Sequence, residues 1–264
     1  ERATGKVEGK KFADDVFNLL IIVLLGIVFL VEIFTPVMVY LIAPGFYENT
    51  EKFDIAVQLT RITFPFLFFV SLSSFFSGIL NSNNRFAAAA AAPIILNIFL
   101  ILSLFISYFF NLNYELNLSY AVTLAGLFQL IFLIFFTKFY YKPSINFKIK
   151  INSKVNFFLK KLLPSIFSSG VTQINILVGT IIASFEAGAV SYLYYADRIY
   201  QINLAIAGIA IGTVALPELS KKLKIGNITE AMSIQNKSIE LCLLLSIPAC
   251  FGLIIASQQV VSAL

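Results

Sequence analysis

The sequence contains no histidine and no tryptophan, and it contains only two cysteines. The absence of histidine removes the side chain that most often serves as a general base or a metal ligand near neutral pH. The cysteines, Cys242 and Cys250, lie eight residues apart in one apolar segment. That arrangement fits neither a disulfide framework nor a zinc site. We interpret both as packing residues and expect no resident metal or other cofactor.

Charged residues are also scarce, at 12% of the chain against about 25% in soluble domains. Hydrophobic residues make up 59% of the 264 residues, and the mean hydropathy is +0.88. No single soluble core could bury so much apolar surface, so the composition indicates an integral membrane protein.

Seven apolar segments are long enough to cross a bilayer as helices, since a span needs about 20 mostly apolar residues. They are too long for barrel strands, and their polar and apolar residues do not alternate. The sequence therefore predicts an all-α fold, a polytopic membrane helix bundle, with spans at about Val16–Tyr40, Ile55–Leu80, Phe86–Phe110, Leu118–Phe136, Val155–Ser184, Ala189–Leu216 and Thr229–Ala256.

The basic residues favour one side of this bundle. Of the 19 Lys and Arg residues, only Lys52 and Arg61 fall on the side of the loop after the first span, and Arg198 lies within the sixth. The positive-inside rule places the other, Lys-rich side in the cytoplasm. The net charge of +5 is thus an orientation signal and gives no reason to expect a nucleic-acid partner. The Lys-rich connection after the fourth span is expected to lie against anionic membrane lipids.

A polar stripe interrupts the sixth span. Its residues are spaced three or four apart, as on one side of a helix: Ser191, Tyr194, Asp197, Arg198 and Gln201. Ionisable groups inside a span are costly and usually face a cavity or a partner, and the planar guanidinium of Arg suits bidentate binding of phosphate. The stripe is predicted to bind a phosphorylated lipid head group in a cavity. The alternatives are a local Asp197–Arg198 ion pair, or an Arg198 that reaches the outer interface.

Glu32, towards the outer end of the first span, is a second candidate. A role at the membrane interface fits its position as well as a functional role does. Gln173 and Asn175 in the fifth span are weaker candidates, because polar residues often hold membrane helices together.

Two motifs resemble those of a known family. Residues 188–220, "GAVSYLYYADRIYQINLAIAGIAIGTVALPELS", are similar to the pattern G-x-V-S-x-x-Y-Y-A-D-R-[LI] followed by G-[VI]-A-[IL]-G-T-x-x-L-P-x-L-S. Residues 77–98, "SGILNSNNRFAAAAAAPIILNI", are similar to G-x-L-N-x-x-x-R-F and P-x-x-x-N. On these motifs the chain resembles the MurJ (MviN) family, the lipid II flippases of the multidrug/oligosaccharidyl-lipid/polysaccharide exporter superfamily.

The resemblance implies a larger, two-lobed fold of which this chain is an internal fragment, equivalent to the family's third to ninth helices. Residues 1–136 would hold the rest of the N-lobe with four spans, 137–154 a cytoplasmic Lys-rich linker between the lobes, and 155–264 the start of the C-lobe with three spans.

The resemblance also implies roles for the stripe. Arg198 matches the family's cavity arginine, which is thought to meet the pyrophosphate of lipid II, and Asp197 is its family neighbour. Ser191 matches a cavity-lining serine. Gln201 stands where some members have an acidic residue, which puts an ion-coupling role at this position in doubt.

The implied function is that of a transporter, not an enzyme: a flippase that moves lipid II from the cytoplasmic to the outer leaflet of the bacterial cytoplasmic membrane by alternating access, for cell-wall synthesis. No ATP-binding motif is present, so an ion gradient or the membrane potential would drive it, and the coupling ion stays open. An exporter of another polyprenyl-linked oligosaccharide is an alternative. So is a membrane-embedded polyprenyl-phosphate enzyme, although its Mg²⁺ would need clustered carboxylates. A scaffold in which Asp197 and Arg198 only order helices is a third.

Overall fold

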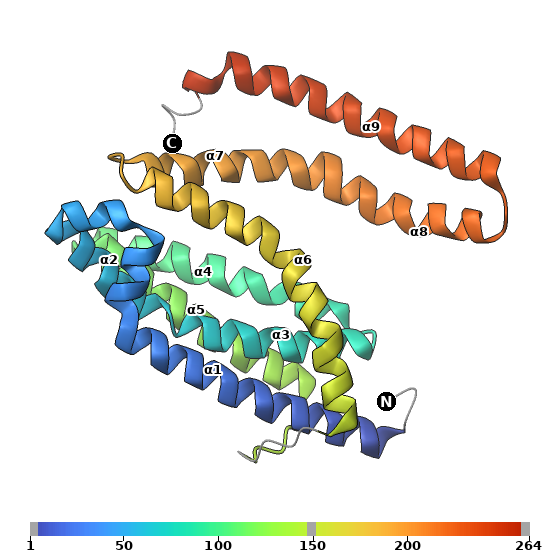
Figure 1. Ribbon diagram of the computed structural model, residues 1–264, viewed down its shortest axis with the longest axis horizontal. Coiled ribbons are helices and arrows are strands. Elements are labelled where there is room, and N and C mark those ends of the chain that lie inside the picture. The colour runs from blue at the N-terminus through green and yellow to red at the C-terminus, as the bar shows by residue number, and fades with distance from the viewer. Residues whose placement is uncertain (1–4, 147–151, 260–264) are drawn as a thin grey trace. The chain divides into compact units, whose positions relative to one another are not determined.

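Helices account for all regular secondary structure in the part of the chain that the computed structural model describes, residues 5–146 and 152–259 (Figure 1). The chain divides into two compact units, Glu1–Glu186 and Ala187–Leu264. The predicted all-α fold is confirmed.

The first unit is built around α5, which packs against α2, α3 and α4, while α1 packs against α2, α3 and α6. Its buried core joins Phe17 of α1 to Phe76 and Leu80 of α3 and Leu133 of α5. Close packing of this kind, and not the hydrophobic effect, holds helices together inside a bilayer. The elements are α1 (Lys6–Ile42), η1 (Pro44–Glu48), α2 (Thr50–Thr63), α3 (Phe66–Ser82), α4 (Phe86–Phe110), α5 (Tyr114–Thr137) and α6 (Ser153–Ala183).

The second unit is a long interrupted helix followed by an antiparallel partner. Its elements are α7 (Ala189–Asn203), the π-helical segment η2 (Leu204–Ala210), α8 (Ile211–Lys224) and α9 (Ile228–Ile255). The thiol of Cys242 on α9 donates to the carbonyl of Ala207 in η2, with 2.9 Å between sulfur and oxygen. The turn after α8 uses Gly226 at φ +78°, a left-handed conformation that favours glycine. Lys222 and Glu230 form an ion pair across this turn.

Asparagine begins helices in both units. In each case the side-chain Oδ1 accepts a hydrogen bond from the backbone N–H three residues on, which satisfies one of the unpaired donors of the first turn. The caps are Asn49 with Lys52, Asn113 with Leu116, Asn152 with Val155, and Asn227 with Glu230.

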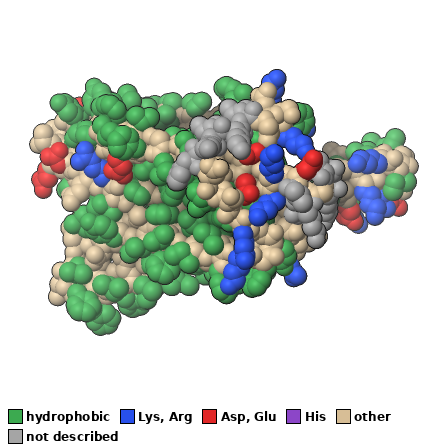
Figure 2. Space-filling view, turned by 90° about the horizontal axis from the view of Figure 1, so that it is seen from below, with side chains coloured by type: hydrophobic (Ala, Val, Ile, Leu, Met, Phe, Trp, Pro, Cys, Tyr) green, Lys and Arg blue, Asp and Glu red, His purple; other side chains and the backbone are tan. Residues whose placement is uncertain are grey.

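The predicted spans match helices of the structure. Within the described residues, six helical segments are long and apolar enough to cross a membrane, and the bent α6 makes a seventh if it counts as one span. Most of their large apolar side chains are exposed, and the space-filling view shows broad apolar surfaces between patches of charge (Figure 2). Such surfaces suit contact with lipid.

The helices are less regular than the apolar runs suggested. The second span is interrupted at Phe64–Pro65, and α1 has a non-helical residue, Phe34, two positions before Pro36. Both breaks lie beside a proline, which removes a backbone hydrogen bond and kinks a helix. The two halves of α6, Ser153–Phe167 and Ser169–Ala183, are bent by 40°.

The compact units do not follow the predicted lobes. The expected C-lobe begins at residue 155, yet α6 packs against α1 within the first unit. The two lobes and the boundary between them therefore stay predictions. Lys148 and Lys150 of the predicted linker lie outside the described residues.

Candidate functional site

The five predicted site residues all lie on α7. Within their own unit Asp197 is half-buried and the other four are exposed: Ser191, Tyr194, Arg198 and Gln201. The helix therefore presents one continuous polar strip more than two turns long. Arg198 stays exposed even though its guanidinium contacts its neighbours on α7.

Arg198 contacts Tyr194 and Gln201 directly, and it is linked to Asp197 only through Gln201. The guanidinium Cζ lies 4.8 Å from the ring centroid of Tyr194, one turn earlier. Its Nη1 donates to Oε1 of Gln201 at 3.4 Å, and Nε2 of Gln201 donates to Oδ2 of Asp197 at 2.5 Å. Gln201 thus connects the acid and the base, whose side chains leave the helix about 100° apart.

This arrangement leaves a positive charge available. The ion pairs among the described residues join Lys154 to Glu8 and Lys222 to Glu230, so neither involves Arg198. The neutral amide of Gln201 occupies one edge of the guanidinium. The Tyr194 ring contacts the guanidinium in a cation–π interaction. The remaining N–H groups can bind an anion with two parallel hydrogen bonds, as phosphate prefers.

Glu32, the second candidate, lies on α1 in the other unit. It is half-buried, and its Oε1 atom is buried with no hydrogen-bond partner among the described residues. Thr35, one turn on, instead donates to the backbone carbonyl of Val31. The structure therefore shows no hydrogen bond to this buried oxygen among the described residues, and the role of Glu32 stays a prediction.

A second polar cluster was not predicted from the sequence. Asp14 on α1 accepts hydrogen bonds from the hydroxyl of Tyr141 at 2.6 Å and from the backbone N–H of Ser144 at 3.0 Å. Asn18 donates to the carbonyl of Ser144 at 2.9 Å and accepts from the N–H of Asn146 at 2.7 Å. Burial, and then the hydrogen bond to Asp14, raise the pKa of Tyr141. The phenol therefore stays protonated and keeps donating at physiological pH.

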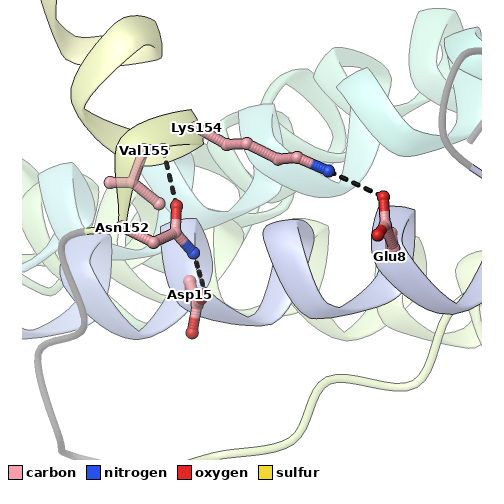
Figure 3. Close-up of polar contacts among 5 residues, drawn as sticks. All are labelled: Glu8, Asp15, Asn152, Lys154 and Val155. Carbon is pink, nitrogen blue, oxygen red and sulfur yellow. Dashed lines mark hydrogen bonds and ion pairs between the residues drawn. The ribbon is translucent and has the colours of Figure 1, made fainter.

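The same stretch of α1 also holds the start of α6 (Figure 3). Asn152, while capping α6 at Val155, donates through Nδ2 to Oδ2 of Asp15 at 2.8 Å. Nζ of Lys154 lies 2.7 Å from Oε2 of Glu8. We call these contacts of α1 with residues 141–146 and 152–154 the α1 clasp. They fasten both flanks of residues 147–151 to one helix.

Only the α1 side of the clasp could be anticipated from the sequence. Asp14 and Asn18 are spaced four apart, so a polar face on α1 could be anticipated. Their partners lie 126 to 130 residues away and are mostly backbone groups. Backbone groups carry no sequence signature, so the contact could not be predicted.

Comparison with known proteins identifies the family. The family profile described as "Lipid II flippase MurJ" matches residues 1–264. The chain belongs to the MurJ family. The resemblance read from the two sequence motifs is thus confirmed, and the match extends over both compact units.

Individual relatives agree with the family profile. A protein of Rickettsia prowazekii (strain Madrid E), named "Probable lipid II flippase MurJ", is 42% identical over 260 residues, which are 97% of this chain and 50% of the relative. A protein of Rhizobium tropici with the same name is 41% identical over 267 residues, 99% of this chain and 50% of the relative. The chain spans about half the length of the curated relatives it matches.

A solved structure has the same fold. The structure titled "Lipid II flippase MurJ, inward closed conformation" matches with a TM-score of 0.78 and 28% sequence identity, over 97% of this chain and 52% of the solved chain. These comparisons establish the MurJ family and fold. They do not assign roles to single residues, so those of Ser191, Tyr194, Asp197, Arg198 and Gln201 remain predictions.

Proposed function

We propose that the full-length protein is a lipid II flippase of the bacterial cytoplasmic membrane. It would carry the peptidoglycan precursor from the cytoplasmic to the outer leaflet by alternating access. The observation that carries the proposal is the family match over all 264 residues. It is supported by Arg198, an arginine on a membrane-spanning helix that forms no ion pair with any described residue. The predicted lobes, 1–136 and 155–264 with a linker at 137–154, are part of this proposal.

In this proposal Arg198 binds the pyrophosphate of the substrate. Tyr194 and Gln201 support its guanidinium from the same helix, so little side-chain entropy remains to be lost on binding. Asp197 is engaged by Gln201 and does not neutralise the arginine directly. Ser191, one turn before Tyr194, adds a hydroxyl to the same strip. The site is thus suited to a doubly charged phosphate group and opposes cationic cargo.

The energy for transport would come from the membrane. The sequence contains no nucleotide-binding loop, and moving one charge across the bilayer releases about 2.3 kcal/mol per 100 mV of membrane potential. That amount changes an equilibrium between two conformations nearly 50-fold, which is enough to bias a transport cycle. The coupling ion is left open.

The test is complementation with the full-length protein. A bacterium is depleted of its own flippase, and growth and the outward exposure of lipid II are measured with the wild-type protein, Arg198→Ala and Arg198→Lys, each at equal membrane abundance. We expect rescue by the wild type, none by Arg198→Ala, and poor rescue by Arg198→Lys, because Lys keeps the charge but loses the planar fork.

The other outcomes distinguish the alternative roles of Arg198 and the alternative substrates. Equal rescue by all three proteins would leave the flippase function standing and reduce Arg198 to a helix-packing role. No rescue by well-expressed wild-type protein would favour a different polyprenyl-linked oligosaccharide as the substrate, since such lipids share the pyrophosphate but differ in the sugar.

A further inference from the structure

A surface groove runs between α4 and α5, within the first unit. It has a volume of about 420 Å³ and is lined by Ile95, Ile98 and Phe99 of α4 and by Phe128, Ile131 and Phe135 of α5, among others. All the lining residues are apolar, so the groove offers no hydrogen bond to a peptide or a sugar. Along α5 its lining extends from Phe128 to Phe135, a stretch of eight residues that rises by about 10 Å. Its shape and chemistry fit a hydrocarbon chain.

One cation lies at an end of this groove, and a second flanks the neighbouring ends of α4 and α5. Nζ of Lys138, which directly follows α5, lies 3.8 Å from the ring centroid of Phe135, a lining residue. Arg85, which directly precedes α4, lies with its Cζ 5.8 Å from the ring of Tyr140. Neither cation has a carboxylate within ion-pair distance among the described residues. The α5 end of the groove therefore meets an uncompensated positive charge at Lys138, and Arg85 adds a second one beside Tyr140, two residues after Lys138. We call Lys138, Tyr140 and Arg85 the rim.

The start of α4 adds to this positive potential. Arg85 caps the helix without a side-chain hydrogen bond to the first turn. The free N–H groups and the helix dipole therefore favour an anion at the same place. By the distribution of Lys and Arg, this end of α4 and α5 faces the cytoplasm.

We propose that the groove and its rim bind one anionic phospholipid of the cytoplasmic leaflet. An acyl chain lies along Phe128, Ile131 and Phe135, and the phosphate lies between Lys138 and Arg85. Charge complementarity selects this occupant: a neutral lipid would leave both cations unpaired, and a protein helix would bury them without a partner. The proposal does not depend on the transported substrate.

Native mass spectrometry of the full-length protein in detergent micelles tests the site, with phosphatidylglycerol and phosphatidylcholine as probes. We expect one phosphatidylglycerol to bind in preference to phosphatidylcholine. The double variant Arg85→Gln/Lys138→Gln should lose roughly 30-fold in affinity, about fivefold for each cation. Lys52→Gln is the matched control, because Lys52 also lies over a phenylalanine, Phe46, at 3.9 Å but is far from the groove in sequence and on the opposite membrane side by prediction.

A second pair of variants tests whether the apolar lining of the groove holds the acyl chain. Ile131→Trp fills the groove and should abolish the preference for one bound phosphatidylglycerol. Ile134→Trp places the same bulk on α5 at a similarly exposed position outside the lining, 41% against 51% exposed, and should bind like the wild type. Because both variants add the same side chain to one helix, a general loss of folding would affect both.

Three results would overturn the proposal. Equal binding of the two phospholipids would reduce the groove to ordinary contact with bulk lipid. Binding of lipid II, but not of phosphatidylglycerol, that is lost in Ile131→Trp would assign the groove to the polyprenyl chain of the substrate. A cysteine at position 131 that is inaccessible to a membrane-soluble maleimide would show that protein covers the groove.

Discussion

Single side chains of α1 and of the connection after α5 make several contacts each. Asn18 is 6% exposed and uses its one amide to satisfy two backbone groups, Ser144 O and Asn146 N, that would otherwise lack partners near the membrane surface. Tyr141, also 6% exposed, reaches Asp14 and packs its ring against Phe75 at a centroid distance of 6.0 Å.

Tyr141→Phe should destabilise the protein without altering its packing. The variant keeps the ring but removes the hydroxyl, so the Asp14 carboxylate loses a donor in a buried setting. We expect the free energy of unfolding to fall by about 1–2 kcal/mol, measured by titrating the full-length protein in dodecylmaltoside micelles with SDS. Tyr140→Phe is the control, since Tyr140 is 41% exposed and its hydroxyl forms no hydrogen bond with the described residues. Equal unfolding midpoints for the two variants would show that the Tyr141–Asp14 bond contributes nothing.

Gly45→Ala should be costly because there is no room for a side chain. Gly45 donates its N–H to Oγ of Ser184 at 3.0 Å, and an added Cβ would overlap the backbone carbonyl of Ser184. Overpacking against backbone costs about 1–3 kcal/mol. Gly26→Ala is the matched control, because a Cβ there meets nothing within 4 Å, and it should be neutral or stabilising in the same titration. A Gly45→Ala protein as stable as wild type would mean that the outer end of α6 can move away freely.

At the scale of the elements, the existence of each span could be predicted but its irregularities only in part. Hydropathy over about 20 residues marks a span whatever its neighbours are, and the third predicted span, Phe86–Phe110, coincides with α4. The proline-linked breaks at Phe64–Pro65 and Phe34 had a visible cause. The π-helical segment η2 had no cause that is visible in the sequence, because a change of hydrogen-bond register over seven residues leaves the apolar composition unchanged.

The start of α6 depends on both a cap and a tertiary contact. Asn152 caps α6 and also donates to Asp15 of another helix, whereas the side-chain partner seen for Asn227 among the described residues is Glu230 in the first turn of α9. Loss of a cap costs about 1 kcal/mol, and loss of the bond to a carboxylate adds on the order of 1 kcal/mol. Asn152→Ala should therefore destabilise more than Asn227→Ala. In the Asp15→Ala background, Asn152→Ala and Asn227→Ala should destabilise the protein equally. A double-mutant cycle of Asn152→Ala and Asp15→Ala measures the coupling energy between the two side chains. A coupling energy near zero would mean that the hydrogen bond between Asn152 and Asp15 is not formed in solution.

The Glu8–Lys154 pair should matter much less. Its side chains are 61% and 49% exposed, and an exposed pair is worth about 1 kcal/mol or less and weakens with salt. We expect Lys154→Met to change the unfolding midpoint only slightly at low ionic strength and not at all near 1 M salt. A large effect that persists at high salt would instead point to packing of the lysine stem.

At the scale of the whole molecule, family, fold class and membrane nature followed from the sequence, whereas the arrangement of its parts did not. The stripe on α7 was visible as a spacing of three and four residues, but the link from Arg198 through Gln201 to Asp197 required coordinates. The clasp required contacts across 126 or more residues. The orientation in the membrane rests on charge alone, and it can be tested directly.

Four single cysteines test this orientation in full-length protein whose Cys242 and Cys250 are replaced by serine. Glu51 and Glu186 lie in connections predicted to face outward, whereas Lys142 and Ile225 lie in connections predicted to face the cytoplasm; all four are exposed. In intact spheroplasts, a membrane-impermeant maleimide should label cysteines at 51 and 186, and should label those at 142 and 225 only after lysis. The alternation follows from an odd number of crossings between each outer and inner probe.

The probe at position 186 carries the most information, because α6 separates it from position 142. The two halves of α6 are bent by 40°, so the helix either crosses the bilayer as one bent span or turns back as a re-entrant pair. A crossing exposes position 186 to the outside, while a re-entrant pair leaves it on the side of position 142. In the second case every later element is inverted, α8 brings Lys221, Lys222 and Lys224 to the outer face, and the positive-inside rule is violated. The charge distribution therefore predicts outside labelling at 186, and inside labelling there would remove α6 from the set of spans.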